Sequence, residues 1–336
     1  MENTELLARL ADAVCIGNLK DAALIAKSEL QKYAEVSDFG TAGIVAKINK
    51  GKERTLLLDA HIDEVGFVVT SVFEDGFLKV AAVGGIDPRI LPDTKVLVHG
   101  KECVPALFTS TPPHLAKNES EAVSLDDILL DTGLGADAVK VISVGDYVTF
   151  KQSFSPLLGS RVTGKSLDDR AAVYCLLELV RRVYDKPLSY NIIISLSEQE
   201  ELGTRGAVTA AFASECDEAI AVDVSFGNQP CVSPDECGRL GDGVMIGISP
   251  ILSKKMTDRL TDLAKQNSIP HQFEVMGGRT GTDADVITVS KSGIPTALLS
   301  IPLRNMHTPV EVADTADIEA VVSLLSAYIT GGADNA

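Results

Sequence analysis

Charged side chains interrupt an apolar stretch of the sequence at residues 56–69, LLLDAHIDEVGFVV. The stretch begins and ends as a buried strand does, yet its middle contains Asp59, His61, Asp63 and Glu64. Open α/β sheets bind ligands at the carboxyl ends of their strands, so residues that follow an apolar run are the informative ones. Four further places of this kind contain Asp168 and Asp169 (SLDDRAAV), Glu198, Glu200 and Glu201 (ISLSEQEELG), Asp223 (AIAVDVS) and His307 (LLSIPLRNMHTP).

Each of these places alone fits an ordinary structural role. Asp168 or Asp169 is typical of a helix N-cap, Asp223 of a turn after a strand, and the pair Glu200 and Glu201 of a solvated corner. Together they are harder to explain in this way. If the five ends meet at one edge of a sheet, at least five carboxylates share a small volume, and such close like charges oppose folding unless cations lie among them.

Two histidines, His61 and His307, fall on these predicted strand ends. A mixed set of imidazoles and carboxylates suits Zn²⁺, Co²⁺ or Mn²⁺, and a carboxylate between two cations suits a two-metal hydrolytic centre. Asp63 lies two residues after His61, and side chains at i and i+2 of a strand share a face, so Asp63 is placed to orient the imidazole. The other three histidines are interpreted as surface or core residues: His99, His114 and His271.

An alternation of helix and strand patterns must position these residues. Two amphipathic helical patterns lie within residues 5–34, and they precede strands predicted at about 42–48 and 55–60. Alternation after residue 161 is typical of βαβ units around a largely parallel sheet. The predicted elements there are helix 169–184, strand 190–197, helix 205–214, strand 218–224, helix 252–266, strand 295–301 and helix 316–330, the last with Thr315 as its N-cap.

The segment from about 67 to 160 has a different pattern. It consists of short β-type runs broken by turn residues, with Asp75-Gly76 as a hairpin signal. This pattern predicts a compact β-domain that interrupts the α/β part. The length of 336 residues also favours two parts, because a single hydrophobic core usually stops growing below that size.

The composition restricts the partners and the compartment. Thirty Lys and Arg against 47 Asp and Glu give a formal charge of −17, which disfavours nucleic acid and anionic membranes as partners. The N-terminus lacks the pattern of a signal peptide, and no apolar run reaches the ~18 residues that span a bilayer, so we expect a cytoplasmic protein. The six cysteines are far apart without a CxxC pair, which disfavours a disulfide framework or a zinc-thiolate site.

The sequence resembles the M42 metallo-aminopeptidases over nearly its whole length. Members of that family are often labelled glutamyl aminopeptidase or endoglucanase-like, and the better-known ones form tetrahedral dodecamers. Any one of the shared motifs is weak, but eight in family order are highly specific. They are AHIDEVGF (60–67), GGIDPRIL (84–91), TPPHL (111–115), LDDR (167–170), EQEELGTRGA (198–207), AVDV (221–224), GTDADV (281–286) and IPLRNMHTPVE (301–311).

The resemblance implies a role for each matching residue. Asp168 would bridge two divalent metal ions per subunit and would be followed by a cis peptide bond to Asp169. The remaining metal ligands would be His61 and Glu201 at one ion, and Asp223 and His307 at the other. Glu200 would be the general base, with Asp63 as the partner of His61. The implied reaction is removal of the N-terminal residue from short peptides.

The resemblance also implies the domain organisation. A three-layer catalytic α/β domain with a mostly parallel central sheet would comprise residues 1–66 and 161–336. Residues 67–160 would form an inserted β-barrel used in subunit contacts, and dimers would assemble into a homododecamer. This division agrees with the change of sequence pattern described above.

Two segments depart from the family pattern. The family often has a Pro-Gly-x-Ser-Gly-type loop near residue 15, where this chain has AVCIGNLKD, so we expect a differently shaped loop. The segment MGGRTGTDADV replaces a commoner run of three glycines, and it supplies the candidate substrate-binding residues Gly278, Arg279 and Thr282. Arg279 fits either a contact with an acidic substrate side chain or a solvated loop position. No P-loop Lys-Ser/Thr follows these glycines, which disfavours a phosphate-binding loop.

Two other functions remain open from the residues. Paired carboxylates also hydrolyse sugars, which leaves a metal-dependent, endoglucanase-like glycosidase as one alternative, although a chain with no Trp and 6 Tyr offers few stacking platforms. The other alternative is a catalytically inactive metal-binding scaffold, which would require a broken ligand set.

Overall fold

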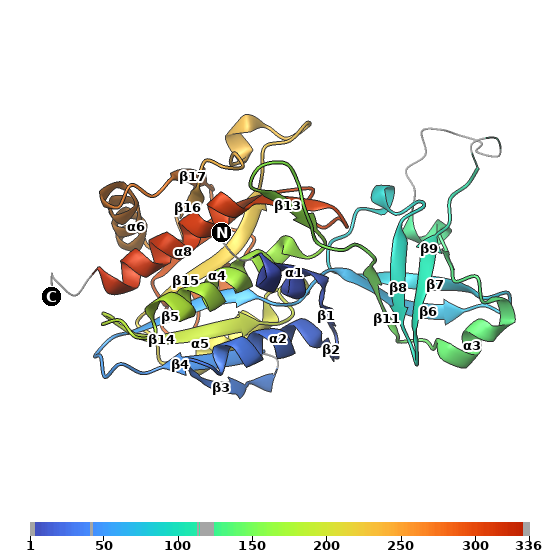
Figure 1. The fold of residues 1–336 in the computed structure, drawn as a ribbon, viewed down its shortest axis with the longest axis horizontal. Coiled ribbons are helices and arrows are strands. Elements are labelled where there is room, and N and C mark those ends of the chain that lie inside the picture. Colours follow the sequence, from blue (N-terminus) through green and yellow to red (C-terminus); the bar gives the residue numbers. More distant parts are fainter. Residues whose placement is uncertain (1–3, 41–42, 113, 115–123, 332–336) are drawn as a thin grey trace.

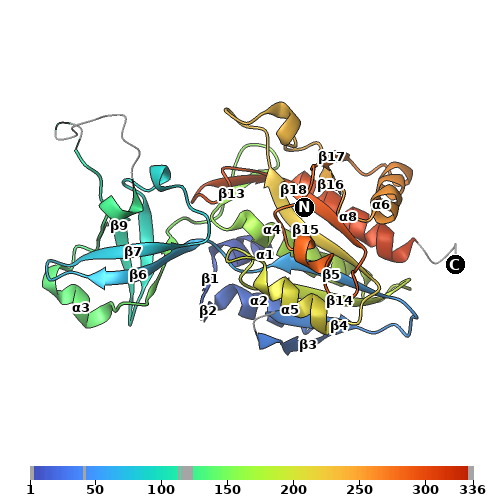
Figure 2. The same ribbon diagram turned by 180° about the vertical axis from the view of Figure 1, so that it is seen from behind.

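The computed structural model describes residues 4–40, 43–112, 114 and 124–331. It has two parts that lie side by side along the longest axis of the molecule (Figure 1). One part is a large α/β body built from both ends of the chain. The other is a small β-barrel formed by the intervening segment, and the view from behind shows the same separation (Figure 2).

An eleven-stranded sheet forms the centre of the α/β body, in the order β12-β13-β19-β18-β15-β5-β14-β4-β3, with β16 paired to β18 and β17 to β16. The four strands at its middle, β18, β15, β5 and β14, are parallel to one another, so their carboxyl ends meet at one edge. The bounds are β3 Glu35–Asp38, β4 Ile44–Ile48, β5 Thr55–His61, β12 Ser155–Pro156, β13 Arg161–Gly164, β14 Asn191–Ser197, β15 Glu218–Phe226, β16 Val244–Ile248, β17 His271–Val275, β18 Thr296–Arg304 and β19 Glu311–Asp314.

Helices cover both faces of this sheet. Successive residues of β5 pack on opposite faces: Leu56 and Leu58 join the larger core, and Leu57 joins the smaller one. The larger core lies under α1 Glu5–Asp12, α2 Asp21–Leu30, α4 Leu167–Val183, α6 Lys254–Gln266 and α8 Thr315–Thr330. The smaller one lies under α5 Arg205–Ala213 and α7 Ala284–Ile287. The predicted three-layer α/β architecture is therefore confirmed.

The predicted start of the last helix is wrong by one residue. Asp314 is the N-cap of α8, and its carboxylate accepts a hydrogen bond from the backbone N–H of Ala316 at 2.9 Å. Thr315, the predicted cap, is the first residue of the helix. A carboxylate at this position also interacts favourably with the positive end of the helix dipole, which favours Asp314 over the neighbouring hydroxyl.

The inserted segment forms a closed barrel in the order β10-β7-β6-β11-β8-β9. Its strands are β6 Gly66–Val72, β7 Phe77–Val83, β8 Lys95–His99, β9 Cys103–Phe108, β10 Leu130–Asp131 and β11 Tyr147–Phe150. Phe67 packs edge-on against Phe108 and Phe150 in a core separate from that of the sheet. The predicted β-barrel is confirmed. Ser155–Pro156, which fell inside the predicted insert, pairs instead with β13 of the large sheet.

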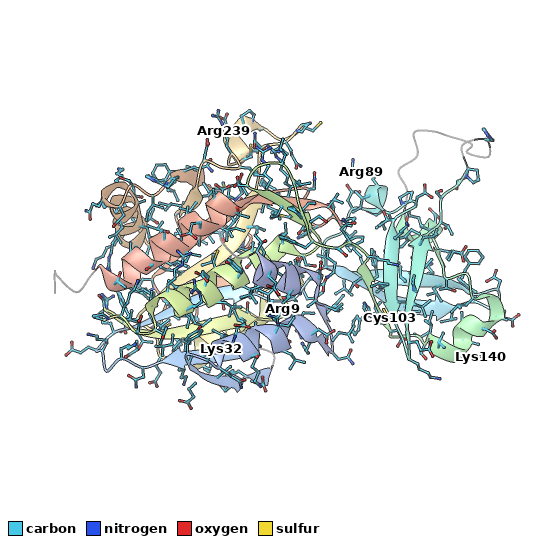
Figure 3. The ribbon with its side chains drawn as sticks, in the orientation of Figure 1. Arg9, Lys32, Arg89, Cys103, Lys140 and Arg239 are labelled. Atoms are coloured by element: carbon cyan, nitrogen blue, oxygen red, sulfur yellow. The ribbon has the colours of Figure 1, made fainter. Side chains whose placement is uncertain are left out.

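Two expectations from the sequence concern the cysteines and membrane-spanning helices. Cys103 lies on the barrel with Lys140, away from the α/β body that contains Arg9 and Lys32 (Figure 3). All six cysteines are free thiols, and no candidate metal-binding group among the described residues includes one. In that part of the chain, no helix is both long and apolar enough to cross a bilayer.

Candidate active site

Asp168 lies at the centre of the predicted strand ends. Its Oδ1 is 3.0 Å from Nε2 of His61, and its Oδ2 is 3.2 Å from Nε2 of His307. His61 ends β5, His307 follows β18, and Asp168 lies in the first turn of α4, so three separate elements bring these side chains together. The peptide bond from Asp168 to Asp169 is cis, as the resemblance implied.

The carboxylates around Asp168 form two neighbouring groups. Glu201 belongs with His307, because its Oε1 is 3.3 Å from Nε2 of that imidazole. Asp223, near the end of β15, belongs with His61, and their ligand atoms lie within 4.8 Å of each other. The expected grouping placed Glu201 with His61 and Asp223 with His307, and ligand atoms of Glu201 and His61 also lie within 4.8 Å of each other, in a set with Glu200. Sequence order could not decide between the two, because both imidazoles contact the same central carboxylate.

Asp63 connects the loop after β5 to the glutamates after β14. Its Oδ1 is 3.5 Å from Nδ1 of His61 and accepts a hydrogen bond from the backbone N–H of Glu200 at 3.1 Å. Its Oδ2 accepts a longer hydrogen bond, 3.4 Å, from the N–H of Glu201. Asp63 therefore fixes the backbone that presents both glutamates as well as lying beside the imidazole.

Glu311 is a site residue to which the sequence analysis gave no role. It lies on β19, is 2% exposed, and accepts hydrogen bonds from two backbone N–H groups. One comes from Asp168 at 3.1 Å and the other from His307 at 2.9 Å. A single buried carboxylate thus holds the two segments that present these side chains. Its position in the motif IPLRNMHTPVE was a signal, but no spacing rule connects it to Asp168.

The resemblance gave Asp169 no role beyond the cis bond. Its Oδ2 accepts a hydrogen bond from the backbone N–H of His61 at 3.3 Å, and its Oδ1 is buried without a hydrogen-bond partner among the described residues. Ligand atoms of Asp169, His61 and Asp223 lie within 4.8 Å of one another. The consecutive pair of aspartates therefore contacts both the side chain and the backbone of His61.

Burial in the cluster raises the pKa of a carboxyl group, and neighbouring charges and hydrogen bonds oppose or add to this effect. Burial alone would raise the pKa of Asp168, but hydrogen bonds from His307 and His61 hold it below its usual value. Burial alone would lower the pKa of His307. Its hydrogen bonds with Asp168 and Glu201 outweigh burial and raise that pKa to about 11. The carboxylates thus favour positive charge beside them, whether from a protonated imidazole or from a bound cation.

Glu200 differs from its neighbours. Burial is the largest cause that raises its pKa, to about 8; the charge of His61 opposes the shift, and the carboxylates of Asp283 and Glu201 add to it. Glu200 accepts no side-chain hydrogen bond among the described residues and lines the cavity described next. It is thus the free carboxyl group of the pair Glu200 and Glu201.

A cavity of about 820 Å³ opens beside the cluster. Two of the three predicted substrate-binding residues, Arg279 and Thr282, line it, whereas Gly278 is not among its lining residues. Its wall is of mixed character, with the apolar side chains Phe226 and Phe273 near the acidic centre. The cavity is large enough for an amino-acid side chain and several atoms on either side of it.

The two unusual segments differ in their relation to the site. The segment around residue 15 forms the hairpin β1 Cys15–Ile16 and β2 Leu19–Lys20, and it does not contribute to the cavity lining. Lys20 forms an ion pair with Glu198, which removes that glutamate from the acidic cluster. The Arg279 segment does reach the cavity. Of the TPPHL motif, Pro113 and Leu115 lie outside the described residues.

Comparison with known proteins agrees with this geometry. Residues 42–324 match the family of M42 glutamyl aminopeptidases. This chain belongs to the M42 peptidase family. The lysyl aminopeptidase of Pyrococcus furiosus is 32% identical over 307 residues, which are 89% of this chain and 88% of the relative. The M42 peptidase described here is therefore an aminopeptidase, a hydrolase of the exopeptidase class.

Solved structures share the fold of this M42 peptidase over almost its full length. The TET aminopeptidase of the marine sediment archaeon Thaumarchaeota archaeon SCGC AB-539-E09 has a TM-score of 0.92 at 28% identity, covering 97% of this chain and 95% of that one. The TET1 peptidase of Pyrococcus horikoshii has a TM-score of 0.84 at 30% identity, with 96% and 98% covered. That peptidase can assemble into a tetrahedron or a large octahedral shell.

Proposed function

We propose that this aminopeptidase uses two divalent metal ions and Glu200 to release the N-terminal residue of short peptides. The observation that carries the proposal is the contact of both imidazoles with the two oxygens of Asp168. Had His61 and His307 lain far apart, no pair of neighbouring ions could have shared that carboxylate. The location of the cluster at the meeting point of four parallel strand ends adds support.

The residues present fit a pair of metal ions. The described residues contain three sets of imidazole and carboxylate groups, and within each set the ligand atoms lie within 4.8 Å of one another. His61, Asp168, Asp169 and Asp223 are buried, and Glu200, Glu201 and His307 are partly buried. Buried carboxylates at this density need more positive charge than two imidazoles supply. We assign one ion to His61, Asp168 and Asp223, and the other to Asp168, Glu201 and His307. Zn²⁺, Co²⁺ and Mn²⁺ all accept such mixed nitrogen and oxygen ligands.

Two ions bound there would acidify a water molecule and polarise the scissile carbonyl group. Glu200 then accepts the proton from that water, because it is the carboxyl group left free beside Glu201. The protonated Glu200 returns the proton to the leaving amine. Asp63 keeps Glu200 in place through its backbone N–H. Burial raises the pKa of Glu200, so its ionised carboxylate is a stronger base toward that water than the carboxylate of an exposed glutamate.

The acidic centre also explains an exopeptidase. The free α-amine of a substrate is cationic at neutral pH, so the carboxylates beside the cavity attract it. A substrate with a blocked N-terminus presents no such charge. We therefore expect aminoacyl-p-nitroanilides to be cleaved and their N-acetylated counterparts to react at the background rate.

The test is a panel of aminoacyl-p-nitroanilides with enzyme stripped by a chelator and then reconstituted with Zn²⁺, Co²⁺ or Mn²⁺. Activity should disappear on chelation and return on reconstitution, at about two ions per chain. Full activity in the metal-free enzyme, or equal cleavage of acetylated substrates, would contradict the proposal. Metal binding without any cleavage would support the inactive-scaffold alternative, and matched p-nitrophenyl glycosides test for a glycosidase.

We further propose that the barrel mediates assembly into a closed tetrahedral shell, which contains twelve subunits. Large apolar side chains on the barrel are exposed, including Phe73, Val139 and Val144. Burial of these side chains between subunits would remove apolar surface from water. Light scattering after size exclusion should give twelve times the 35.5 kDa of one chain. A monomeric mass at micromolar concentration would contradict this proposal.

A further inference from the structure

The motif GGIDPRIL has no role in the mechanism above, yet its first two residues reach the metal-binding cluster. Gly84 and Gly85 follow β7, so they belong to the barrel and not to the α/β body. The carbonyl oxygen of Gly85 is 2.6 Å from Nδ1 of His307. The barrel therefore touches one of the two imidazoles at the centre.

This contact determines which nitrogen of His307 faces the carboxylates. A carbonyl oxygen can only accept, so Nδ1 must carry the proton that it donates. In the neutral imidazole, Nε2 then has its lone pair free, and Nε2 is the atom that lies 3.2 Å from Asp168 and 3.3 Å from Glu201. A hydrogen bond of this kind orients a metal-binding histidine and selects its tautomer.

Gly84 must be glycine for this turn to form. Its φ is +83°, in the region that side chains disfavour. A Cβ at this position would lie 2.8 Å from Cγ1 of Val65, and 3.3 Å from both Cβ and Oε2 of Glu201. The backbone of the barrel thus approaches the second carboxylate of the same group as closely as sterics permit.

We infer that the Gly84-Gly85 turn of the barrel is a positioning element for the metal site of Asp168, Glu201 and His307. The turn acts on only one of the two proposed metal sites. Among the proposed ligands, its described contacts are to His307 and Glu201, and none is to His61 or Asp223. The inference rests on the proposed two-metal function. It adds that one of the ions depends on the barrel and the other does not.

The test compares Gly84→Ala with Gly145→Ala. Gly145 is a matched control, because it also belongs to the barrel and has a positive φ of +95°, but a Cβ there meets nothing within 4 Å. Apoenzymes are titrated with Co²⁺ and followed by visible absorption and by bound metal per chain. We expect Gly84→Ala to retain one ion with wild-type affinity and to bind the other about 10- to 100-fold more weakly. Gly145→Ala should bind both as the wild type does.

A second variant guards against misfolding of the first. Gly85 has no positive φ, and a Cβ there would lie 3.4 Å from Nδ1 of His307, so Gly85→Ala places a methyl group in contact with the imidazole without backbone strain. It should weaken the same single ion. If both variants bound both ions with wild-type affinity, or if both ions were weakened equally, the inference would be overturned and the proposed function would stand. A wild-type enzyme that binds no divalent metal would overturn the proposed function together with it.

Discussion

A Glu200→Gln variant should bind metal as the wild type does and lose about 10²- to 10⁴-fold in kcat. The amide has the shape of the carboxyl group but cannot take a proton from water or return one to the leaving amine. Glu200 belongs to neither of the two assigned ligand sets, so metal content should not change. Metal analysis after dialysis and steady-state kinetics on one aminoacyl-p-nitroanilide measure both quantities in the same sample.

Glu198→Gln is the matched control, because Glu198 lies two residues earlier on the same strand end. Its carboxylate is paired with Lys20 and is not part of the cavity lining. Its kcat should stay within a few-fold of the wild type. A Glu200→Gln enzyme with near wild-type kcat would show that another group moves the proton. Loss of metal in that variant would instead make Glu200 a ligand.

The second large effect is on stability. Glu64 is 2% exposed, and its Oε2 is 2.6 Å from both Nζ of Lys165 and Oγ of Ser166. Its Oε1 accepts from the N–H of Cys15 at 2.9 Å and lies 3.6 Å from Arg170. A Glu64→Gln variant leaves two buried cations without their counter-charge. Removal of one partner from such a network costs about 3 to 5 kcal/mol of unfolding free energy.

The pH dependence provides a check on the cause. Burial alone would raise the pKa of Glu64, but the charges of Lys165 and Arg170 hold it below its usual 4.5. A carboxyl group with a lowered pKa in the folded state stabilises the protein above its unfolded-state pKa, and this contribution is lost as the pH falls through the folded-state pKa. The gap between wild type and Glu64→Gln should therefore be full at pH 7 and shrink below about pH 4.5.

Urea unfolding of the metal-free proteins at several pH values measures that gap. Asp258→Asn is the control, because Asp258 forms an exposed pair with Lys254 on α6. Pairs of that kind contribute less than about 1 kcal/mol. If Glu64→Gln were no less stable than Asp258→Asn, or if the gap did not depend on pH, the buried network would not have the role assigned to it.

The sequence predicted the fold where apolar patterns decide it. The parallel centre, the longer helices and the interrupting barrel follow from period, length and turn residues. The sequence analysis did not predict the shorter strands β3, β13, β16, β17 and β19 of the large sheet. The residues of the acidic cluster also followed, because parallel strands bring their carboxyl ends to one edge. His61, Asp168 and His307 meet there as expected.

The grouping within the cluster did not follow from the sequence, because it depends on side-chain directions. Nε2 of His307 lies 3.3 Å from Glu201, while Nδ1 of the same ring donates to the carbonyl oxygen of Gly85, a contact between distant parts of the chain. Glu64 sits beside Asp63 in the same motif but points to Lys165 and Arg170. No local pattern distinguishes the two carboxylates.

The hydrogen bond from His307 to Gly85 has a consequence for how this architecture can change over time. A β-barrel inserted into an α/β body would be expected to change in size or be replaced during evolution without effect on the active site. Here any replacement for the barrel would have to place a carbonyl oxygen where that of Gly85 lies, to within a few tenths of an ångström. The strands and loops of the barrel that do not contact the site could change as the neighbouring subunits change. The hairpin β6-β7 is constrained instead, because it leads into the turn that contacts His307.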